Sequence, residues 1–245
     1  MTQLATGVGD LGRGLAALRA HPALWKWLVA PAIVTLLLVA AAVFGIVHAI
    51  DPVVGWVTAH LPGWLASVVG PVLGVLVVGV MIAAALFAFT AIAGVVAGPF
   101  CERLSEHLEA ELTGRPPSPF SLREFIHGAL LSVVHAARRL VAAVVALALV
   151  FALGFVPVVG SIAAVAVAVW FAATAASYDC YDAVFGRRMM AYRDKLAYLA
   201  RHRGRTLGLG LAVAGLLLVP GLNLIALGVG AAGATVADLA MRPPA

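Results

Sequence analysis

Two uninterrupted apolar runs dominate the first hundred residues of the chain. The first extends from Leu24 to Ile50 and the second from Val68 to Ala97. Each run exceeds the ~20 helical residues that a hydrocarbon core of ~30 Å requires. The apolar residues are continuous rather than alternating with polar ones, which favours helices over the strands of a barrel. The pattern predicts two helices that cross a membrane completely.

Two later apolar blocks, 140–177 and 207–237, are each interrupted near the middle, by FVPVVGS and by LVPGLNL. Proline ends the incoming helix because the residue before it avoids the α region, and a following glycine allows a tight reversal. The residues that we expect at the two helix breaks, as candidates to line a pore, are Pro157, Gly160, Ser161, Pro220, Gly221 and Asn223.

Each break separates two short arms. The arm 207–219 would be only ~20 Å long at 1.5 Å per helical residue, which is less than the ~30 Å of hydrocarbon that it would have to cross. We therefore expect two helical hairpins that penetrate the membrane about halfway. Two ordinary transmembrane hairpins with tight outer turns are the alternative, because helix tilt and hydrophobic mismatch weaken arguments from length.

The remaining segments are amphipathic. Leu104, Leu108 and Leu112 recur at helical spacing, whereas Glu106 and Glu109 fall elsewhere around the same helix. A capping box at Ser121 and Glu124 opens a further helix. The predicted fold is thus an all-α integral membrane protein with two long transmembrane helices, two Pro/Gly-broken half-penetrating hairpins and amphipathic cytoplasmic helices. One membrane domain over residues 1–245 is the simplest division.

Composition supports lipid as the solvent for much of the chain. Hydrophobic residues make up 63% of the 245 residues, charged residues make up 11%, and the mean hydropathy is +1.07. A soluble domain of this size could not bury so much apolar surface. No Lys or Arg occurs between Lys26 and Arg103, and the other basic residues cluster so that all can face the cytoplasm. This asymmetry predicts cytoplasmic N- and C-termini and explains the net charge of +5 without nucleic-acid binding.

The sequence contains no signature of an enzyme. It has no paired-histidine zinc motif, no nucleophile elbow and no phosphate-binding loop, so we expect neither catalysis nor a metal or other cofactor. Helices that start after Pro157 and Pro220 would instead expose unsatisfied N–H groups, and the positive end of the helix dipole, at membrane depth. Such helix starts attract anions. Alternatively, the side chains of Ser161 and Asn223 stabilise the two turns.

Several motifs together resemble one known family. They are HPALWKWLVAP before the first span, GPFCERLSEHLEAELTG after the second, and FVPVVGS, YDCYDAVF and LVPGLNLIALGVGAAGATV in the two hairpin regions. The pattern resembles the CysZ family of bacterial sulfate permeases, which is related to a eukaryotic endoplasmic-reticulum membrane family. The resemblance implies two full transmembrane helices and two half-penetrating helix pairs in a homo-oligomer. It also implies passive entry of sulfate through the inner membrane for cysteine biosynthesis.

The resemblance also implies an anion-binding segment before the first span, where family members bind sulfate through backbone amides and arginine. The matching positions are Pro22, Ala23, Leu24, Trp25 and Lys26. The glycine and the first arginine of the family pattern are missing, so bidentate recognition of the oxyanion by arginine is lost here. Arg19, one to two helical turns upstream, is a candidate replacement. Glu106 and Glu109 match the charged helix of the family and are further pore candidates, and a solvated face is the competing interpretation.

Two functions follow from these observations. The leading one is passive permeation of sulfate or a related oxyanion. The alternative is a non-transporting membrane scaffold that resembles the eukaryotic branch. In that case the stretch 187–205, with seven basic residues against the single acidic Asp194, would dock anionic lipid headgroups or an acidic partner.

Overall fold

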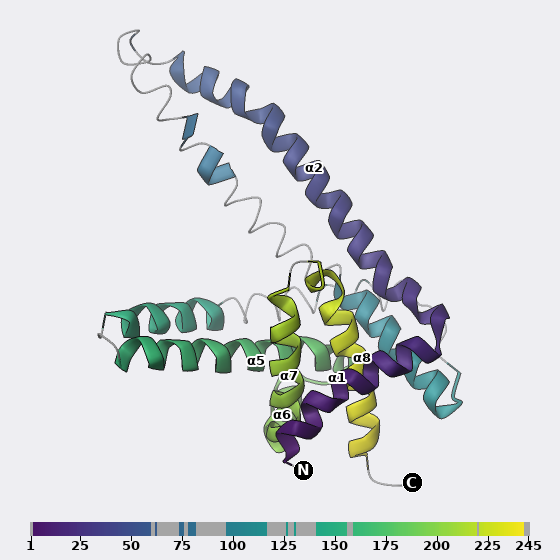
Figure 1. Ribbon diagram of the computed structural model, residues 1–245. Helices are drawn as coiled ribbons and strands as arrows, with labels where there is room; N and C mark the ends of the chain where they lie inside the picture. The colour runs from purple at the N-terminus through teal and green to yellow at the C-terminus, as the bar shows by residue number, and fades with distance from the viewer. Residues whose placement is uncertain are drawn as a thin grey trace. The chain divides into compact units, whose positions relative to one another are not determined.

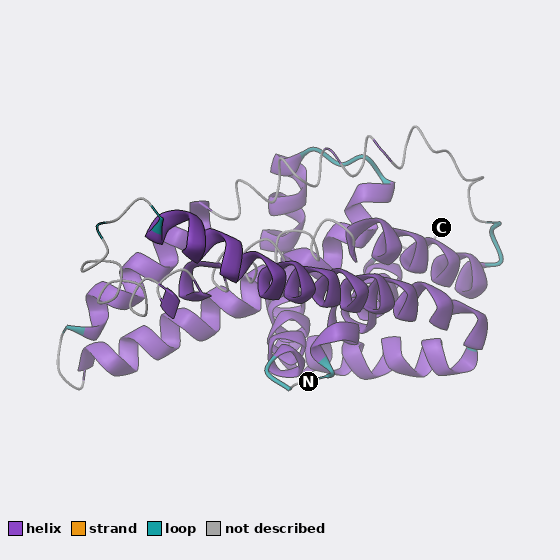
Figure 2. Cartoon of the chain, turned by 90° about the horizontal axis from the view of Figure 1, so that it is seen from above, coloured by secondary structure: helices purple, strands orange, loops and turns teal. Residues whose placement is uncertain are grey.

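The computed structural model describes residues 2–59, 62, 74, 75, 78–81, 97–116, 126, 130, 141–155, 159–219 and 221–242, and these contain helices and no strand (Figure 2). This confirms the all-α class. Contacts divide the chain into two compact units, Met1–Ala32 with Val95–Ala245, and Ile33–Gly94. A single membrane domain stays a prediction.

Helix α2 (Trp25–Thr58) is long enough to cross a membrane. It is continuous over 34 residues, and Pro22–Ala49 is a candidate span by length and composition. Beyond its first turns many of its large apolar side chains are exposed; Leu36 and Leu37, for example, are 62% and 65% exposed. Large apolar side chains exposed over several turns of a helix are typical of contact with lipid rather than of a soluble core. The first predicted span therefore corresponds to a helix, whereas most of the second, Val68–Ala97, lies outside the described residues.

The larger unit contains a group of packed helices. They are α1 (Gln3–Ala20), α5 (Val159–Arg187), α6 (Tyr192–Arg201), α7 (Arg203–Leu217) and α8 (Asn223–Met241). Helix α1, for which the sequence analysis predicted no element, packs against both α7 and α8 (Figure 1). It ends at Ala20, where the chain turns through η1 (Pro22–Leu24) into α2.

Glycines allow α1 to approach its neighbours at backbone distance. A Cβ atom at Gly7 would meet the carbonyl oxygen of Arg205 in α7, and one at Gly14 would meet the backbone of Gly233 in α8. A Cβ at Gly208 would likewise meet the carbonyl oxygen of Leu4. Small residues at helix crossings are the usual means of close packing in membrane proteins, where burial of apolar surface gives little driving force.

One apolar cluster joins α1 and α2 to the helical segment 97–113. Leu18, Leu24, Leu28, Leu104 and Leu108 are its fully buried leucines. The predicted apolar face of the segment is confirmed for Leu104 and Leu108. Leu112, expected on the same face, is 45% exposed because it lies at the end of the helix.

The first broken apolar block forms an extended pair of helices. Val141–Gly154 is followed by a break, and α5 begins at Val159, so the predicted interruption is present. Helix α5 is 29 residues long, which is longer than the short arm expected, and it is itself a candidate span. Its outer half, 159–170, is mostly exposed, whereas its inner half packs against α7 and α8. We call Val141–Gly154 together with 159–170 the apolar arm (Figure 1).

Candidate functional site

The turn between α1 and α2 contains the segment that the resemblance implies for anion binding. Pro22 has no N–H group, and the amides of Leu24 and Trp25 donate to the carbonyl oxygens of His21 and Pro22. The amides of Leu24 and Trp25 are therefore already hydrogen-bonded within the turn, and Pro22 has no amide N–H to offer an anion. Any anion held at this turn has to rely mainly on side chains.

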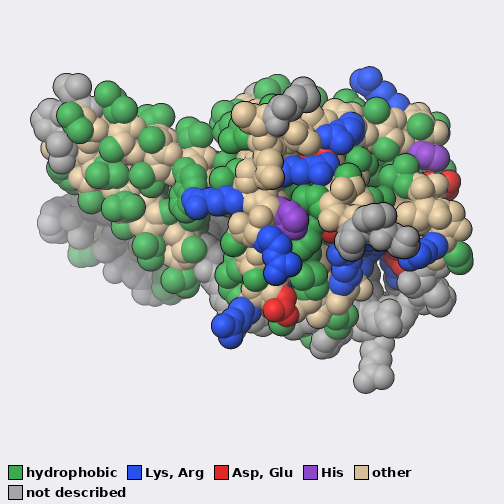
Figure 3. Space-filling view, turned by 90° about the horizontal axis from the view of Figure 1, so that it is seen from below, with side chains coloured by type: hydrophobic (Ala, Val, Ile, Leu, Met, Phe, Trp, Pro, Cys, Tyr) green, Lys and Arg blue, Asp and Glu red, His purple; other side chains and the backbone are tan. Residues whose placement is uncertain are grey.

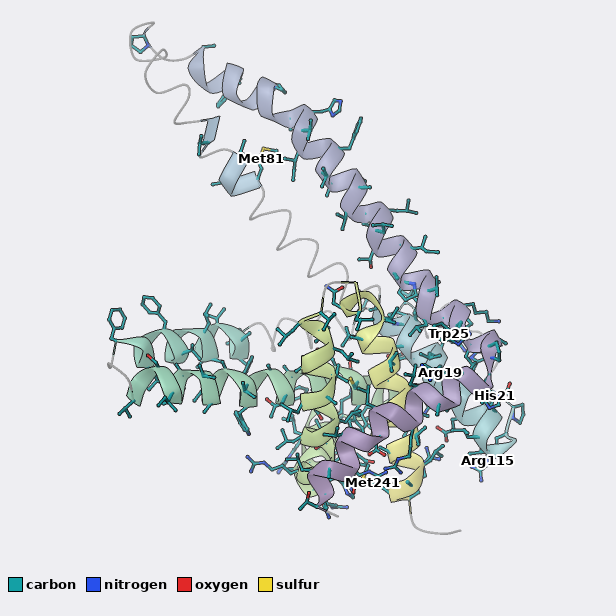
Figure 4. All side chains as sticks on the ribbon, in the orientation of Figure 1. Arg19, His21, Trp25, Met81, Arg115 and Met241 are labelled. Carbon is teal, nitrogen blue, oxygen red and sulfur yellow. The ribbon has the colours of Figure 1, made fainter. Side chains whose placement is uncertain are left out.

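The side chains at this turn divide into structural and exposed ones. Leu24 is buried, and the indole Nε1 of Trp25 donates to the Leu18 carbonyl oxygen at 3.1 Å. Lys26 is exposed, with its Nζ 5.6 Å from the ring centroid of Trp27, and Arg19 is exposed at the end of α1. Figure 4 shows Arg19 and Trp25 at the same turn. Of the five matched positions, only Lys26 presents a positive charge, and Arg19 adds a second.

His21 ties this turn to the helical segment 97–113. Its Nδ1 lies 3.6 Å from a carboxylate oxygen of Glu111. Pro22 and Ala23, the two remaining matched positions, are exposed. The turn thus offers an accessible surface with two cations, Arg19 and Lys26, that have no ion-pair partner among the described residues.

The second helix break is a tight reversal between α7 and α8. Helix α7 ends at Leu217, Leu218 is exposed, and Gly221 has a φ of +86°, which favours glycine at this position. Asn223 begins α8 and is exposed, and the side chain of the preceding residue, Leu222, makes no capping hydrogen bond. Within the described part of the chain, no hydrogen bond of the Asn223 side chain supports the alternative in which it stabilises this turn. Pro220 lies outside the described residues.

The first break differs from the second in the place of its glycine, because Gly160 lies inside the first turn of α5 rather than in the turn before it, where Gly221 lies. Phe155 follows Val141–Gly154, and its ring makes an edge-on contact with Phe151 at a centroid distance of 5.1 Å. Gly160, expected at the reversal, is buried in the first turn of α5, and Ser161 is exposed beside it. Pro157 lies outside the described residues. The structure thus places Gly160 and Ser161 at a helix start on the far side of the break from Phe155.

The two glutamates of the amphipathic helix lie in ion pairs rather than on a solvated face. Glu106 contacts Arg103 at 2.8 Å. Glu109 accepts hydrogen bonds from Arg187 at 2.5 Å and from Arg242 at 2.7 Å. Burial opposes ionisation of Glu109, but these two hydrogen bonds and charges outweigh it and lower its pKa to about 2. Glu109 therefore joins the C-terminal end of the chain to the end of α5.

Sequence reasoning missed two buried acidic residues, Asp10 and Asp238, that pair with the basic stretch 187–205. Asp10 in α1 is fully buried and accepts two hydrogen bonds from Arg205, from Nε at 2.6 Å and Nη2 at 2.9 Å. Asp182 in α5 contacts the buried Lys195 at 2.6 Å. The available signal was the occurrence of single carboxylates inside otherwise apolar helices, which are costly unless paired.

Asp238, near the end of α8, is the centre of the largest group of these contacts. It accepts hydrogen bonds from Arg188 at 3.2 Å, from the Tyr198 hydroxyl at 2.8 Å, and from Arg242 at 3.0 Å and 2.8 Å. Arg188 also contacts the second carboxylate oxygen. Counting Glu109 with Arg187, four of the seven basic residues in 187–205 are held in ion pairs within the unit. The stretch is therefore mainly an internal scaffold.

Glu102 differs from the other buried carboxylates. Burial first, and then the charge of Asp182, raise its pKa to about 7, although Lys195 opposes the shift. Among the described residues, its carboxylate accepts no hydrogen bond. The pKa of Glu102 therefore lies near neutral, above the usual range of a glutamate.

Comparison with known proteins decides the family. The sequence model of the family described as Sulfate transporter CysZ/Etoposide-induced protein 2.4 matches residues 10–227, which include the α1–α2 turn and both helix breaks. The chain belongs to this family. The CysZ resemblance inferred from the motifs is thereby confirmed.

Curated relatives in this family carry the name sulfate transporter CysZ. The protein of Pseudomonas syringae pv. tomato is 29% identical over 235 residues, which cover 94% of this chain and 90% of the relative. The protein of Vibrio parahaemolyticus is 26% identical over 239 residues, covering 95% and 94%. That of Pseudomonas fluorescens Pf-5 is 32% identical over 154 residues, covering 61% and 60%. Together with the apolar helices, these relatives indicate a membrane protein and favour a transporter over a scaffold.

Proposed function

We propose that the protein is a passive permease for sulfate or a related oxyanion in the bacterial inner membrane, where it supplies sulfur assimilation and cysteine biosynthesis. The observation that carries the proposal is the match of residues 10–227 to a sulfate-transporter family, with relatives of that name along nearly the whole chain. The two helix breaks support the proposal physically. A helix start within the membrane attracts an oxyanion without the cost of burying a full cationic charge.

The two broken blocks are proposed to be half-penetrating hairpins. Val141–Gly154 and the 15-residue α7 are each only ~21 to 23 Å long at 1.5 Å per residue, which is short of a ~30 Å core. Helix α5 is long enough to cross, but only its outer half, ~18 Å by the same measure, is exposed and apolar. Its inner half carries Asp182 and packs among the charged contacts of the larger unit, which favours a position outside the hydrocarbon.

The anion pathway is proposed to need several copies of the chain. The exposed start of α8, with Gly221 and Asn223, offers N–H groups that no described side chain caps, and the start of α5 carries buried Gly160 and exposed Ser161. One copy supplies two such helix starts, whereas a ring of copies could place them around an aqueous path. Because the basic residues can all lie on one side of the membrane, we expect every copy to insert in the same orientation, with both termini in the cytoplasm.

Entry into the pathway is proposed to begin at the α1–α2 turn. Lys26 is the exposed cation at the positions matched to the family's sulfate-binding segment, Pro22 to Lys26, and Arg19 compensates for the missing arginine. A lysine attracts sulfate as a point charge and lacks the two parallel hydrogen bonds of an arginine. We therefore expect weaker binding of sulfate at this turn than a paired-arginine site would give.

The test is uptake of radiolabelled sulfate into liposomes that contain the pure protein and a sulfate gradient but no ATP. The proposal expects uptake well above that of empty liposomes. Lys26→Ala should raise the sulfate concentration for half-maximal uptake severalfold, whereas Arg115→Ala, which removes an exposed charge after the helical segment 97–113, should leave it unchanged. Uptake equal to that of empty liposomes, with correctly inserted protein, would end the permease proposal.

A further inference from the structure

Helix α6 has two faces of different character. The inward face carries Lys195, which pairs with Asp182, and Tyr198, which donates to Asp238. The outward face carries exposed Arg193 and Arg201 together with exposed Leu196. Two exposed alanines, Ala197 and Ala200, complete this face. A helix that exposes apolar and cationic side chains on one face is suited to a membrane surface.

Arg203 marks where this face meets the apolar arm. Its guanidinium carbon lies 5.9 Å from the ring centroid of Trp170, which is 50% exposed. Trp170 ends the apolar arm, and tryptophan prefers the interface between hydrocarbon and water. Figure 3 shows Lys and Arg side chains on the body of the unit and none on the visible face of the apolar arm. Arg203 is thus held at the expected level of the lipid headgroups.

The described residues of the protein do not neutralise the charge of this region. Arg193 and Arg201 have no ion-pair partner among the described residues, and the guanidinium of Arg203 contacts an aromatic ring rather than a carboxylate. The four other basic residues of 187–205 are paired with carboxylates. Asp194 is the sole acidic residue in the stretch. Three exposed arginines therefore face one carboxylate, beside exposed Leu196.

We propose that the outward face of α6, with Arg203, binds the phosphate groups of anionic phospholipids. Each arginine would donate to phosphate oxygens, while Leu196 and the exposed Met189 would contact acyl chains. The apolar contacts and the position beside Trp170 favour a lipid over a free anion, because a free anion has no acyl chain to contact Leu196 and Met189. The site is separate from the α1–α2 turn, and its occupancy can be measured without any flux of sulfate.

Native mass spectrometry of the detergent-solubilised protein, titrated with phosphatidylglycerol or phosphatidylcholine, tests this proposal. The wild-type protein should bind phosphatidylglycerol more tightly. Each arginine near a bilayer surface contributes about fivefold, so Arg193→Gln/Arg201→Gln/Arg203→Gln should weaken phosphatidylglycerol binding on the order of a hundredfold. The triple lysine variant at the same positions should keep most of the preference. Arg115→Gln, an exposed charge after the helical segment 97–113, is the matched single-charge control.

Two results would overturn the proposal. One is a triple glutamine variant that folds and still prefers phosphatidylglycerol as strongly as the wild-type protein. The other is full displacement of phosphatidylglycerol by millimolar inorganic phosphate, which would identify a site for free anions instead. The three arginines are exposed, so the thermal stability of the variants should match that of the wild-type protein and a loss of binding reports on the site.

Discussion

Replacement of Asp10 by asparagine tests the importance of the buried ion pair between α1 and α7. Asp10 is fully buried, and its carboxylate accepts two hydrogen bonds from Arg205, whose side chain is only 13% exposed. Asp10→Asn leaves the guanidinium with little water and no counter-charge. Removal of one partner from a buried pair costs about 3 to 5 kcal/mol. At about 2 to 4 °C per kcal/mol for a chain of this size, we expect an apparent Tm lower by about 6 to 20 °C.

The matched variants separate charge from packing. Arg13 contacts the same carboxylate at 2.8 Å but is half exposed, so Arg13→Gln should cost less than about 1 kcal/mol. Asp10→Leu/Arg205→Met replaces the pair with apolar side chains and should recover most of the stability lost by Asp10→Asn, because neither charge is then left unpaired.

Thermal unfolding in detergent can be followed with a thiol-reactive fluorophore. Cys101 and Cys180 are both buried, so labelling reports loss of the packed core. An apparent Tm for Asp10→Asn within about 2 °C of wild type would show that the buried ion pair contributes little to stability. The same conclusion would follow if Asp10→Leu/Arg205→Met lost as much stability as Asp10→Leu and Arg205→Met lose in sum, since contacting residues should be coupled by about 1 to 3 kcal/mol.

Three further predictions concern the same unit. Gly14→Ala should destabilise the protein by several kcal/mol in the thiol assay because its Cβ would meet the α8 backbone, whereas Gly12→Ala, which has open space, should be neutral or slightly stabilising. The folded protein holds the Glu102 proton more tightly than the unfolded chain does, so the free energy of unfolding should fall by about 3 kcal/mol at most as the pH rises from 4.5 through 7. Glu102→Gln should flatten this part of a Tm-against-pH curve. An unchanged slope in the variant would contradict the assignment to Glu102. Arg242→Gln should lower the apparent Tm by about 4 to 8 °C through loss of contacts to Glu109 and Asp238, and a wild-type Tm would show that these contacts contribute little.

Local sequence patterns predicted the elements that depend on local chemistry. The apolar run from Leu24 to Ile50 predicted the first long helix because its length and continuity need no partner. Gly221, at positive φ, and the break before Val159 were predictable because proline and glycine act on their immediate neighbours. The buried side chains of Leu104 and Leu108 followed from helical spacing alone.

Features that depend on distant partners were missed. Helix α1 contains four glycines and a buried aspartate, so its local helix propensity is low, and it is stabilised by close contact with α7 and α8. The stretch 187–205 was interpreted as a possible docking surface because its charges are close in sequence. Their partners, Asp10, Glu109 and Asp238, lie from 50 to 195 residues away. Sequence spacing cannot distinguish such internal pairs from the exposed Arg193 and Arg201.

The proposed anion pathway depends on the two helix breaks turning the chain round within the hydrocarbon layer. Phe155 and Leu218 are 73% and 84% exposed at the two breaks, so each can be replaced by cysteine and carry a nitroxide label. Burial, with the charge of Glu102, raises the pKa of Cys101 to about 12, and Cys180 is also buried, so the introduced thiols should react selectively. Leu112→Cys, on the helical segment 97–113, is the control.

The measurement is the depth of each label in liposomes, from its relative accessibility to oxygen and to a water-soluble nickel chelate. If the hairpins are half-penetrating, labels at both breaks should lie near the middle of the bilayer and be more accessible to oxygen than to the nickel chelate. The label at position 112 should be more accessible to the nickel chelate. Labels at the two breaks that are as accessible to the chelate as the control would place the turns in water. That result would contradict half-penetrating hairpins and the anion path built on them.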